Sequence, residues 1–178
     1  MTGRLADRIA LVTGAGNGIG RASALALAAD GADLFLIDIA DDDVAAAAEA
    51  VRNLGQRAEF AVADCTDAGA LAAAIETARQ AYGRIDILFN NVGQSAREKG
   101  SPFHAADEET WRFVIETSLL ATMRCSRLVA PEMRQRGRGR IINMSSESAF
   151  AGDVGLVDYA AAKMGVIGFT RALARELA

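Results

Sequence analysis

The sequence contains little cysteine, proline, histidine or aromatic residue, and it lacks a long apolar run. Its 178 residues include two Cys, two Pro, one His and 6% aromatic residues. The two cysteines, Cys65 and Cys125, have neither the spacing of a metal site nor that of a disulfide framework, a usage typical of a reducing cytosol. No apolar stretch approaches the ~20 residues that a membrane-spanning helix needs. We therefore expect a cytoplasmic protein that has no metal site and does not contact a membrane.

The chain also lacks a large excess of charge of either sign. The chain has 19 Lys and Arg against 23 Asp and Glu, a net charge of -4, and it has no basic block. This balance argues against a nucleic-acid-binding surface. Residues 1–8 carry an acid and no apolar run, which argues against a secretory signal. At 51% hydrophobic residues the chain is too apolar to be disordered, and its length fits one domain.

Short β-branched runs alternate with alanine-rich helical stretches, the pattern of a parallel sheet covered by helices. We predict an α/β, doubly wound parallel sheet of Rossmann type, in three layers and in one domain spanning 1–178. The Asp run at 41–43 is expected to cap the second helix, and Pro131 to kink or interrupt the fourth. The expected strands are 9–13, 34–38, 60–63, 85–89 and 140–144, and the expected helices are 18–30, 41–54, 67–82, 107–136 and 158–178.

The last expected helix, 158–178, has no strand after it in this sequence. A helix that follows a strand of a parallel sheet normally crosses over to deliver the next strand. Without that strand, the run 140–144 is an unprotected apolar edge. We therefore expect the fold to be incomplete at its C-terminal end.

A glycine-rich segment, Thr13-Gly14-x-x-x-Gly18-x-Gly20, separates the first expected strand from the first helix. Glycines there permit a tight turn and a close approach of the backbone, and the free N–H groups of the helix N-terminus can bind a pyrophosphate. A glycine-rich turn without a ligand is the alternative. The predicted cofactor-binding residues of this segment are Gly14, Asn17, Gly18, Ile19 and Gly20.

Asp38 ends the second expected strand, 24 residues after Gly14. An acid at this place can accept hydrogen bonds from the ribose of an adenosine. Its charge would repel a 2′-phosphate, and Ala15, Asn17 and Ile39 supply no compensating cation, so NAD is favoured over NADP. In the alternative interpretation, Asp38 only caps the next helix.

Tyr159 and Lys163 are four residues apart and share one face of the last expected helix. Lowering the pKa of a tyrosine from about 10 to about 7 requires roughly 4 kcal/mol. An ammonium group ~4 Å away in an effective dielectric of ~20 supplies about that much, so the pair can act as a general acid–base. Ser146, thirteen residues before Tyr159, could hydrogen-bond the same reacting oxygen, although Ser145 beside it could be mistaken for it. A solvated helix face is the alternative for Tyr159 and Lys163.

Together these motifs resemble the short-chain dehydrogenase/reductase family over essentially the whole chain. The resemblance rests on Thr13-Gly14-x-x-x-Gly18-x-Gly20, Asn90-Asn91-Val92-Gly93, Ser146 and Tyr159-x-x-x-Lys163, in that order. It implies a Rossmann-type fold and a hydride exchanged between a nicotinamide and a carbonyl or alcohol carbon.

The resemblance also implies roles for individual residues. Tyr159 would be the acid–base, Lys163 would hold the nicotinamide ribose and lower the phenol pKa, and Ser146 would orient the substrate oxygen. The adenine would meet Asp64 and the backbone at Cys65, and the cofactor groove would be lined by Asn90 and Asn91.

The chain departs from the family pattern at two positions before the last helix. Ser118 stands where the family carries an Asn that supports a water-mediated proton relay to the lysine, and Val92 replaces a small Ala. A third difference is that this sequence lacks the segment that, in the family, closes over nicotinamide and substrate. In the family the long helix and the last helix pair across a two-fold axis, so we expect a homodimer or homotetramer.

The leading hypothesis is an NAD(H)-dependent oxidoreductase that interconverts a secondary alcohol and a ketone, with Tyr159 as the acid–base and Ser146, Lys163 and Ser118 as further catalytic residues. Two alternatives stay open. One is a truncated, non-catalytic NAD-binding or oligomerising subunit, and the other is an NADPH-linked 3-oxoacyl reductase.

Overall fold

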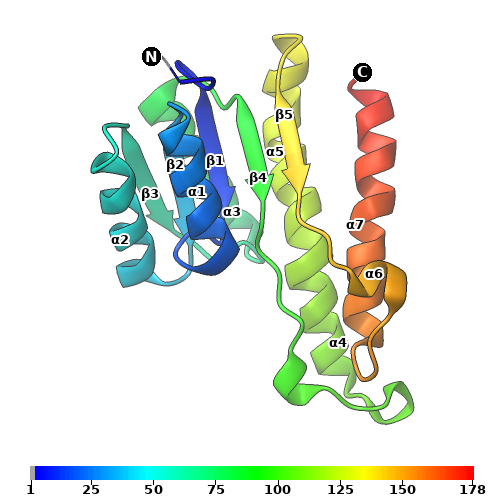
Figure 1. The fold of residues 1–178 in the computed structure, drawn as a ribbon. Coiled ribbons are helices and arrows are strands. Elements are labelled where there is room, and N and C mark those ends of the chain that lie inside the picture. The colour runs from blue at the N-terminus through cyan, green and yellow to red at the C-terminus, as the bar shows by residue number, and fades with distance from the viewer. Residues whose placement is uncertain (1–2) are drawn as a thin grey trace.

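The computed structural model describes residues 3–178 and contains a five-stranded parallel sheet (Figure 1). Its strand order is β3-β2-β1-β4-β5, so the order reverses between β1 and β4. Ligands of open α/β sheets bind outside the carboxyl ends of the strands at such a reversal. The strands are β1 (Ile9–Thr13), β2 (Asp33–Asp38), β3 (Ala58–Val62), β4 (Ile87–Asn90) and β5 (Arg140–Asn143).

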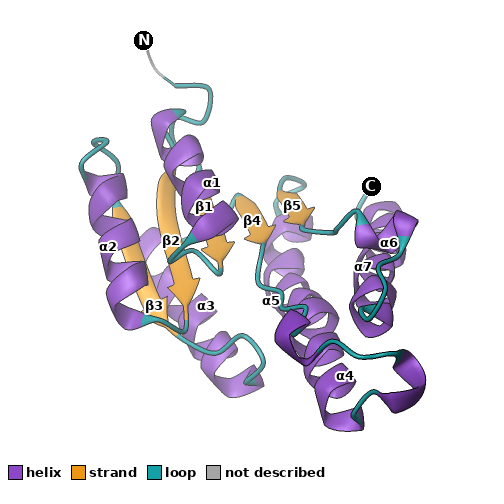
Figure 2. Cartoon of the chain, turned by 60° about the horizontal axis from the view of Figure 1, so that its bottom comes forward, coloured by secondary structure: helices purple, strands orange, loops and turns teal. Residues whose placement is uncertain are grey.

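Helices cover both faces of the sheet, as the sequence predicts (Figure 2). One face packs against α1 (Gly18–Ala29) and α2 (Asp41–Arg52), and the other against α3 (Ala68–Tyr82) and α5 (Ala121–Gln135). The chain is completed by α4 (Glu108–Ile115), α6 (Ser148–Ala151) and α7 (Val157–Glu176), with short 3₁₀ turns at Arg97–Lys99 and Phe103–Ala105. This is a three-layer α/β/α architecture of Rossmann type.

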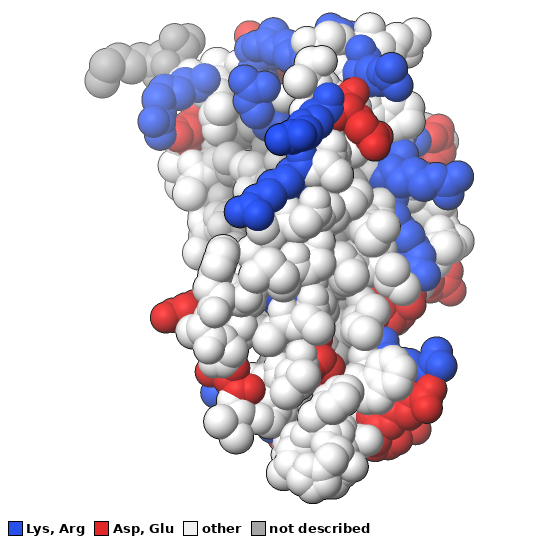
Figure 3. Space-filling view, turned by 90° about the vertical axis from the view of Figure 1, so that its right-hand side faces the viewer, with Lys and Arg blue, Asp and Glu red and all other residues white. Residues whose placement is uncertain are grey.

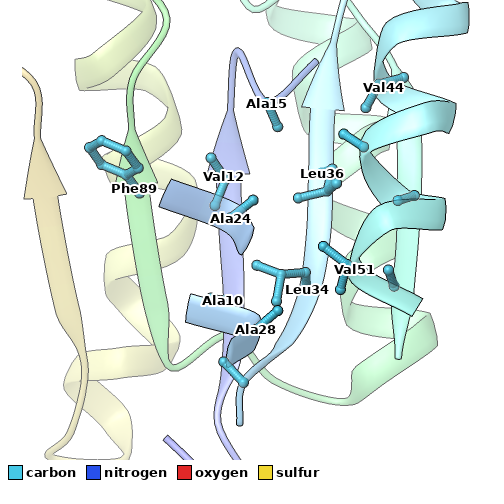
Figure 4. Close-up of a cluster of buried hydrophobic side chains, with 14 of the residues drawn as sticks. Ala10, Val12, Ala15, Ala24, Ala28, Leu34, Leu36, Val44, Val51 and Phe89 are labelled. Carbon is cyan, nitrogen blue, oxygen red and sulfur yellow. The ribbon is translucent and has the colours of Figure 1, made fainter. Parts of the chain in front are cut away.

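The two hydrophobic cores follow from the alternation of side chains along buried strands. Val12 and Leu36 point toward Ala24 of α1 and Val44 of α2 (Figure 4). Their sequence neighbours point the other way, so that Leu11, Phe35 and Ile37 pack with Leu71, Ile75 and Val129 of α3 and α5. Every residue of β1 is buried, which explains why its sequence is apolar without alternation.

The structure corrects two local predictions about helices. The Asp run at 41–43 occupies the first turn of α2, but the residue before the helix is Ala40 and no side chain caps it. The predicted helix 107–136 is divided by a π-helical turn at Glu116–Leu120, whereas α5 continues through Pro131 to Gln135. The interruption of this helical run therefore lies at Glu116–Leu120 and not at Pro131, where the sequence predicts it.

The last helix, α7, lies beside β5 (Figure 1), and Asn143 Nδ2 of β5 donates a hydrogen bond of 2.9 Å to Thr170 Oγ1 of α7. A cavity of about 570 Å³ also lies between the two elements. The cavity is lined by Ile141 and Asn143 of β5 and by Thr170 and Leu173 of α7. β5 is one of the two edge strands of the described sheet, with β3 at the other edge.

Basic side chains gather at the upper end of this side of the molecule, while much of its lower half is uncharged (Figure 3).

Candidate active site

The glycine-rich segment forms a tight loop between β1 and α1. Gly14 and Gly18 have φ angles of +62° and +50°, a region that favours glycine. A methyl group on Gly20 would lie 1.9 Å from the carbonyl oxygen of Gly14, so only a hydrogen fits there. Asn91 Nδ2 donates a hydrogen bond of 3.0 Å to the same Gly14 oxygen and holds the loop against the end of β4.

The N-terminus of α1 is open to an anion. Asn17 precedes the helix without a side-chain capping bond, and the first turn carries no acid. Elsewhere Asp67 caps α3, Asp107 caps α4, and α2 begins with three aspartates. Asn17, Gly18 and Ile19 are exposed, so the free N–H groups of α1 have the arrangement that binds a pyrophosphate.

Asp38 lies at the carboxyl end of β2 beside this loop. Its Oδ2 accepts a hydrogen bond of 2.8 Å from Gly16 N, and its Oδ1 accepts one of 3.1 Å from Ala40 N. The carboxylate thus both fixes the glycine-rich loop and bonds the residue that precedes α2. A carboxylate has about four acceptor positions, so two are left for ribose hydroxyls.

The segment after β3 is joined to Asp38 through the backbone. Ala63 N donates to Asp38 O at 2.9 Å, and the exposed Asp64 accepts two bonds of 2.8 Å from the N–H and hydroxyl of Thr66. The side chain of Cys65 is buried, which raises its thiol pKa to about 12. Cys65 therefore offers its backbone, rather than its thiol, to a ligand.

The two neighbouring asparagines after Phe89 have different surroundings. Asn91 binds the glycine-rich loop, and its N–H donates to Thr13 Oγ1 at 3.1 Å. Asn90 is 2% exposed and donates to Ser126 Oγ of α5 and to Asn143 Oδ1 of β5, at 2.9 and 2.8 Å. Asn90 thus ties β4, β5 and α5 together, and its role in lining a cofactor groove stays a prediction.

Lys163 is buried in the first half of α7. Only 2% of it is exposed, its Nζ donates to Met144 O at 2.9 Å, and it lies 5.8 Å from the centre of the Tyr159 ring. Burial lowers the Lys163 pKa from 10.5 to about 8, because an ammonium loses hydration there. The predicted pair therefore exists on one helical face, and its cation is desolvated.

Ser145 and Ser146, which follow β5, have different hydrogen-bond partners. Ser145 Oγ donates to the backbone oxygen of Lys163 at 3.0 Å, which joins β5 to α7. Ser146 Oγ only accepts, from Ser148 N at 3.2 Å, so its own proton is available to a substrate oxygen. This distinction favours Ser146 as the substrate-orienting hydroxyl.

Ser118 lies in the π turn and is fully buried. Its Oγ both accepts from Gln94 N and donates to Gln94 O, each at 3.0 Å. A methyl group on Gly93 would lie 2.8 Å from Lys163 Nζ and 3.4 Å from Ser118 Oγ. Because Gly93 has no side chain, it leaves room beside it for both Lys163 and Ser118. This glycine is part of the Asn-Asn-Val-Gly motif, but the sequence alone does not indicate this role.

The burial of Lys163 predicts a pH-dependent stability. Since its pKa is about 8 when folded and 10.5 as a free side chain, the unfolded chain binds more protons between these values, and stability rises with pH across that window. Relative to the wild type, Lys163→Met should lose about 2 kcal/mol of unfolding free energy on going from about pH 7 to pH 10. Denaturant unfolding at several pH values measures this. Lys99→Met, at the other, exposed lysine, should follow the wild-type pH profile, and an identical profile for both variants would contradict the burial effect.

Within residues 3–178, no helix has the length and apolar character needed to cross a membrane. The same residues contain no group of three His, Cys, Asp or Glu side chains placed to hold a metal ion.

Comparison with known proteins identifies the family. Residues 8–178 match the model of the short chain dehydrogenases. Over 171 residues the chain is 42% identical to the short-chain reductase protein NovJ of Streptomyces niveus (96% of this chain and 64% of that protein) and 37% identical to the 3-oxoacyl-[acyl-carrier-protein] reductase FabG of Escherichia coli (96% and 68%).

A solved structure shows the same fold. Carveol dehydrogenase from Mycobacterium avium, in complex with NAD, superposes with a TM-score of 0.94 and 33% identity, covering 99% of this chain and 68% of that one. The chain thus spans about two thirds of the length of the relatives it matches. Together with the glycine-rich loop and the Tyr159–Lys163 pair, these matches establish that the chain belongs to the short chain dehydrogenase family.

Proposed function

We propose that the protein is an NAD(H)-dependent oxidoreductase that interconverts a secondary alcohol and a ketone. The observation that carries this proposal is the shared location of two parts. The open N-terminus of α1 and the Tyr159–Lys163 pair follow the carboxyl ends of β1 and β5 in one parallel sheet. This arrangement supports a dinucleotide site beside an acid–base pair at that end of the sheet.

Residues at this edge would hold each part of the dinucleotide. The glycine-rich loop and the N–H groups of α1 would bind the pyrophosphate, and Asp38 would accept hydrogen bonds from the adenosine ribose. Asp64 and the backbone at Cys65 would contact the adenine, and Lys163 would bind the nicotinamide ribose. When bound, the nicotinamide supplies or accepts the hydride.

The chain's own side chains would handle the proton. In reduction, the Tyr159 hydroxyl would donate its proton to the ketone oxygen, and in oxidation the phenolate would take it from the alcohol. The Lys163 ammonium would stabilise the phenolate, and Ser146 would donate a hydrogen bond to the reacting oxygen. Ser118 would fix Gln94, and the remaining lone pair of its oxygen would accept a hydrogen bond from a water beside Lys163.

Relatives support a carbonyl or alcohol carbon as the reacting centre, since one is named a 3-oxoacyl reductase and another a carveol dehydrogenase. An assay of NADH and NADPH oxidation against a panel of ketones and 3-oxoacyl thioesters tests the proposal. Turnover of a ketone with NADH preferred supports it. NADH binding without turnover favours a non-catalytic subunit, and turnover restricted to NADPH and 3-oxoacyl thioesters favours the reductase alternative.

We also propose that two copies pair through α5 and α7. A groove of about 650 Å³ between these helices exposes apolar side chains, among them Met123, Pro131, Phe169 and Leu173. Its apolar lining and its place on the two helices support self-association, and the mass of the protein in solution tests it.

Coenzyme choice should depend on the charge of Asp38. Asp38→Asn keeps an oxygen that can accept from Gly16 N or Ala40 N but removes the charge that would repel a 2′-phosphate. We expect the NADPH-to-NADH preference to shift at least about tenfold toward NADPH, because a like-charge pair at ~4 Å costs between about 1 kcal/mol in water and about 4 kcal/mol near a protein surface. Titration with both reduced coenzymes measures the shift. Asp42→Asn, at an exposed position on the first turn of α2, is the matched control, and equal shifts in the two variants would contradict the role of Asp38.

A further inference from the structure

Arg124 of α5 contacts two segments that are far apart in the sequence, the π turn at Glu116–Leu120 and the segment after β3. Through Nη1 it donates to the carboxylate of Glu116, in the π turn, and to the backbone oxygen of Thr66 at 3.3 Å. The side chains of Arg124 and Glu116 are 34% and 35% exposed. A surface ion pair alone contributes little, but this one also fixes a backbone oxygen outside its own helix.

The hydrogen bond from Arg124 to Thr66 O adds a contact from α5 to the segment after β3. Asp64 already accepts from the N–H and the hydroxyl of Thr66, and Ala63 N donates to Asp38 O. With Arg124 bound to its carbonyl oxygen, Thr66 has a partner for its N–H, its hydroxyl and its carbonyl group. The backbone of residues 63–66 is therefore held from β2 on one side and from α5 on the other.

The π turn explains how Glu116 reaches Arg124. Eight residues of an ordinary α-helix rotate the second side chain about 80° past the first. A π turn takes more residues per revolution, which reduces that rotation and brings the two side chains toward one face. The same turn carries Ser118, whose Oγ binds Gln94. One distortion of the helix thus places Glu116 toward Arg124 and Ser118 toward Gln94.

We propose that Arg124, held by Glu116, is a positioning residue for the adenosine end of the dinucleotide. It would act through Thr66, by fixing the backbone of Asp64 and Cys65 in the shape that receives the adenine. This inference rests on the proposed function, because it takes residues 64–65 as the adenine-binding segment. It assigns a role in that function to Arg124 of α5, which follows residues 64–65 by more than fifty positions in the chain.

The test compares a whole dinucleotide with its nicotinamide half. Binding of NADH and of reduced nicotinamide mononucleotide, which lacks the adenosine, is titrated by fluorescence for wild type, Arg124→Gln, Glu116→Gln and the double variant. Each single variant should weaken NADH binding about fivefold, and the double variant no further, since both remove one connected contact. Binding of the mononucleotide should stay unchanged.

Arg112→Gln is the matched control, because Arg112 pairs with Glu108 in an exposed ion pair earlier in the same helical run. It should leave both affinities unchanged. Wild-type NADH affinity in Arg124→Gln, or equal weakening of both ligands, overturns the inference. If the wild type binds no NADH, the proposed function itself fails. Should Arg124→Gln not fold, Glu116→Gln, which removes the carboxylate that holds Arg124, decides between these outcomes.

Discussion

Tyr159→Phe is expected to lower turnover about a thousandfold while it leaves NADH affinity within about twofold of the wild type. General acid–base catalysis by a positioned side chain contributes roughly 10²–10⁴ in rate, and the substitution removes the only atom of Tyr159 that can exchange a proton. The ring, which lies 5.8 Å from Lys163 Nζ, is retained, so the packing of α7 should persist. Steady-state rates and NADH titration measure the two quantities.

The chain provides a matched control in its second tyrosine. Tyr82 at the end of α3 donates its hydroxyl to Leu34 O at 2.9 Å, away from the candidate site. Tyr82→Phe should cost about 1 kcal/mol of stability, the value of one hydrogen bond, and leave turnover unchanged. Wild-type turnover in Tyr159→Phe would remove Tyr159 from the acid–base role, whereas equal loss in both variants would point to general damage of the fold.

Local sequence predicts those elements whose ends have their own chemical signals. β1 occupies the predicted residues 9–13, because an apolar run stops at a glycine-rich turn. The start of α3 follows from Asp67, which accepts from Gly69 N and Ala70 N, and its end from Gly83, whose φ is +75°. Such caps act within a few residues, so the sequence contains the information for them.

The π turn at Glu116–Leu120 could not be predicted in this way. Whether an N–H bonds four or five residues back depends on what surrounds the helix, and here Gln94 and Thr66 bind Ser118 and Arg124 from distant parts of the chain. Likewise, the spacing of Tyr159 and Lys163 predicts a shared face but gives no sign that Lys163 is buried against Met144 O. Both features arise from tertiary contacts.

The two asparagines illustrate the same limit. Asn90, the last residue of β4, donates to Ser126 of α5, while Asn91, just after the strand, bonds the glycine-rich loop. Adjacent residues in the sequence thus have partners in different parts of the fold, and the sequence does not indicate which partner each one has.

Gly20→Ala is expected to lower both stability and NADH affinity. The added methyl would lie 1.9 Å from Gly14 O and 2.7 Å from Asn91 Nδ2, so either the loop or the first turn of α1 must move. Overpacking of this kind costs about 1–3 kcal/mol, and here it also breaks the bond that Asn91 donates to Gly14. NADH affinity should fall more than tenfold, because the N–H groups of α1 bind a phosphate only at close range.

Gly168→Ala provides the comparison, since Gly168 lies within α7 and has no atom within 4 Å of an added methyl. It should be neutral or stabilise the protein by about 0.5–1 kcal/mol, as alanine does in a helix interior. Denaturant unfolding and NADH titration of both variants measure the difference. Wild-type stability and affinity in Gly20→Ala would mean that the loop can move without cost, and the contact between α1 and Gly14 would then not be what shapes the phosphate site.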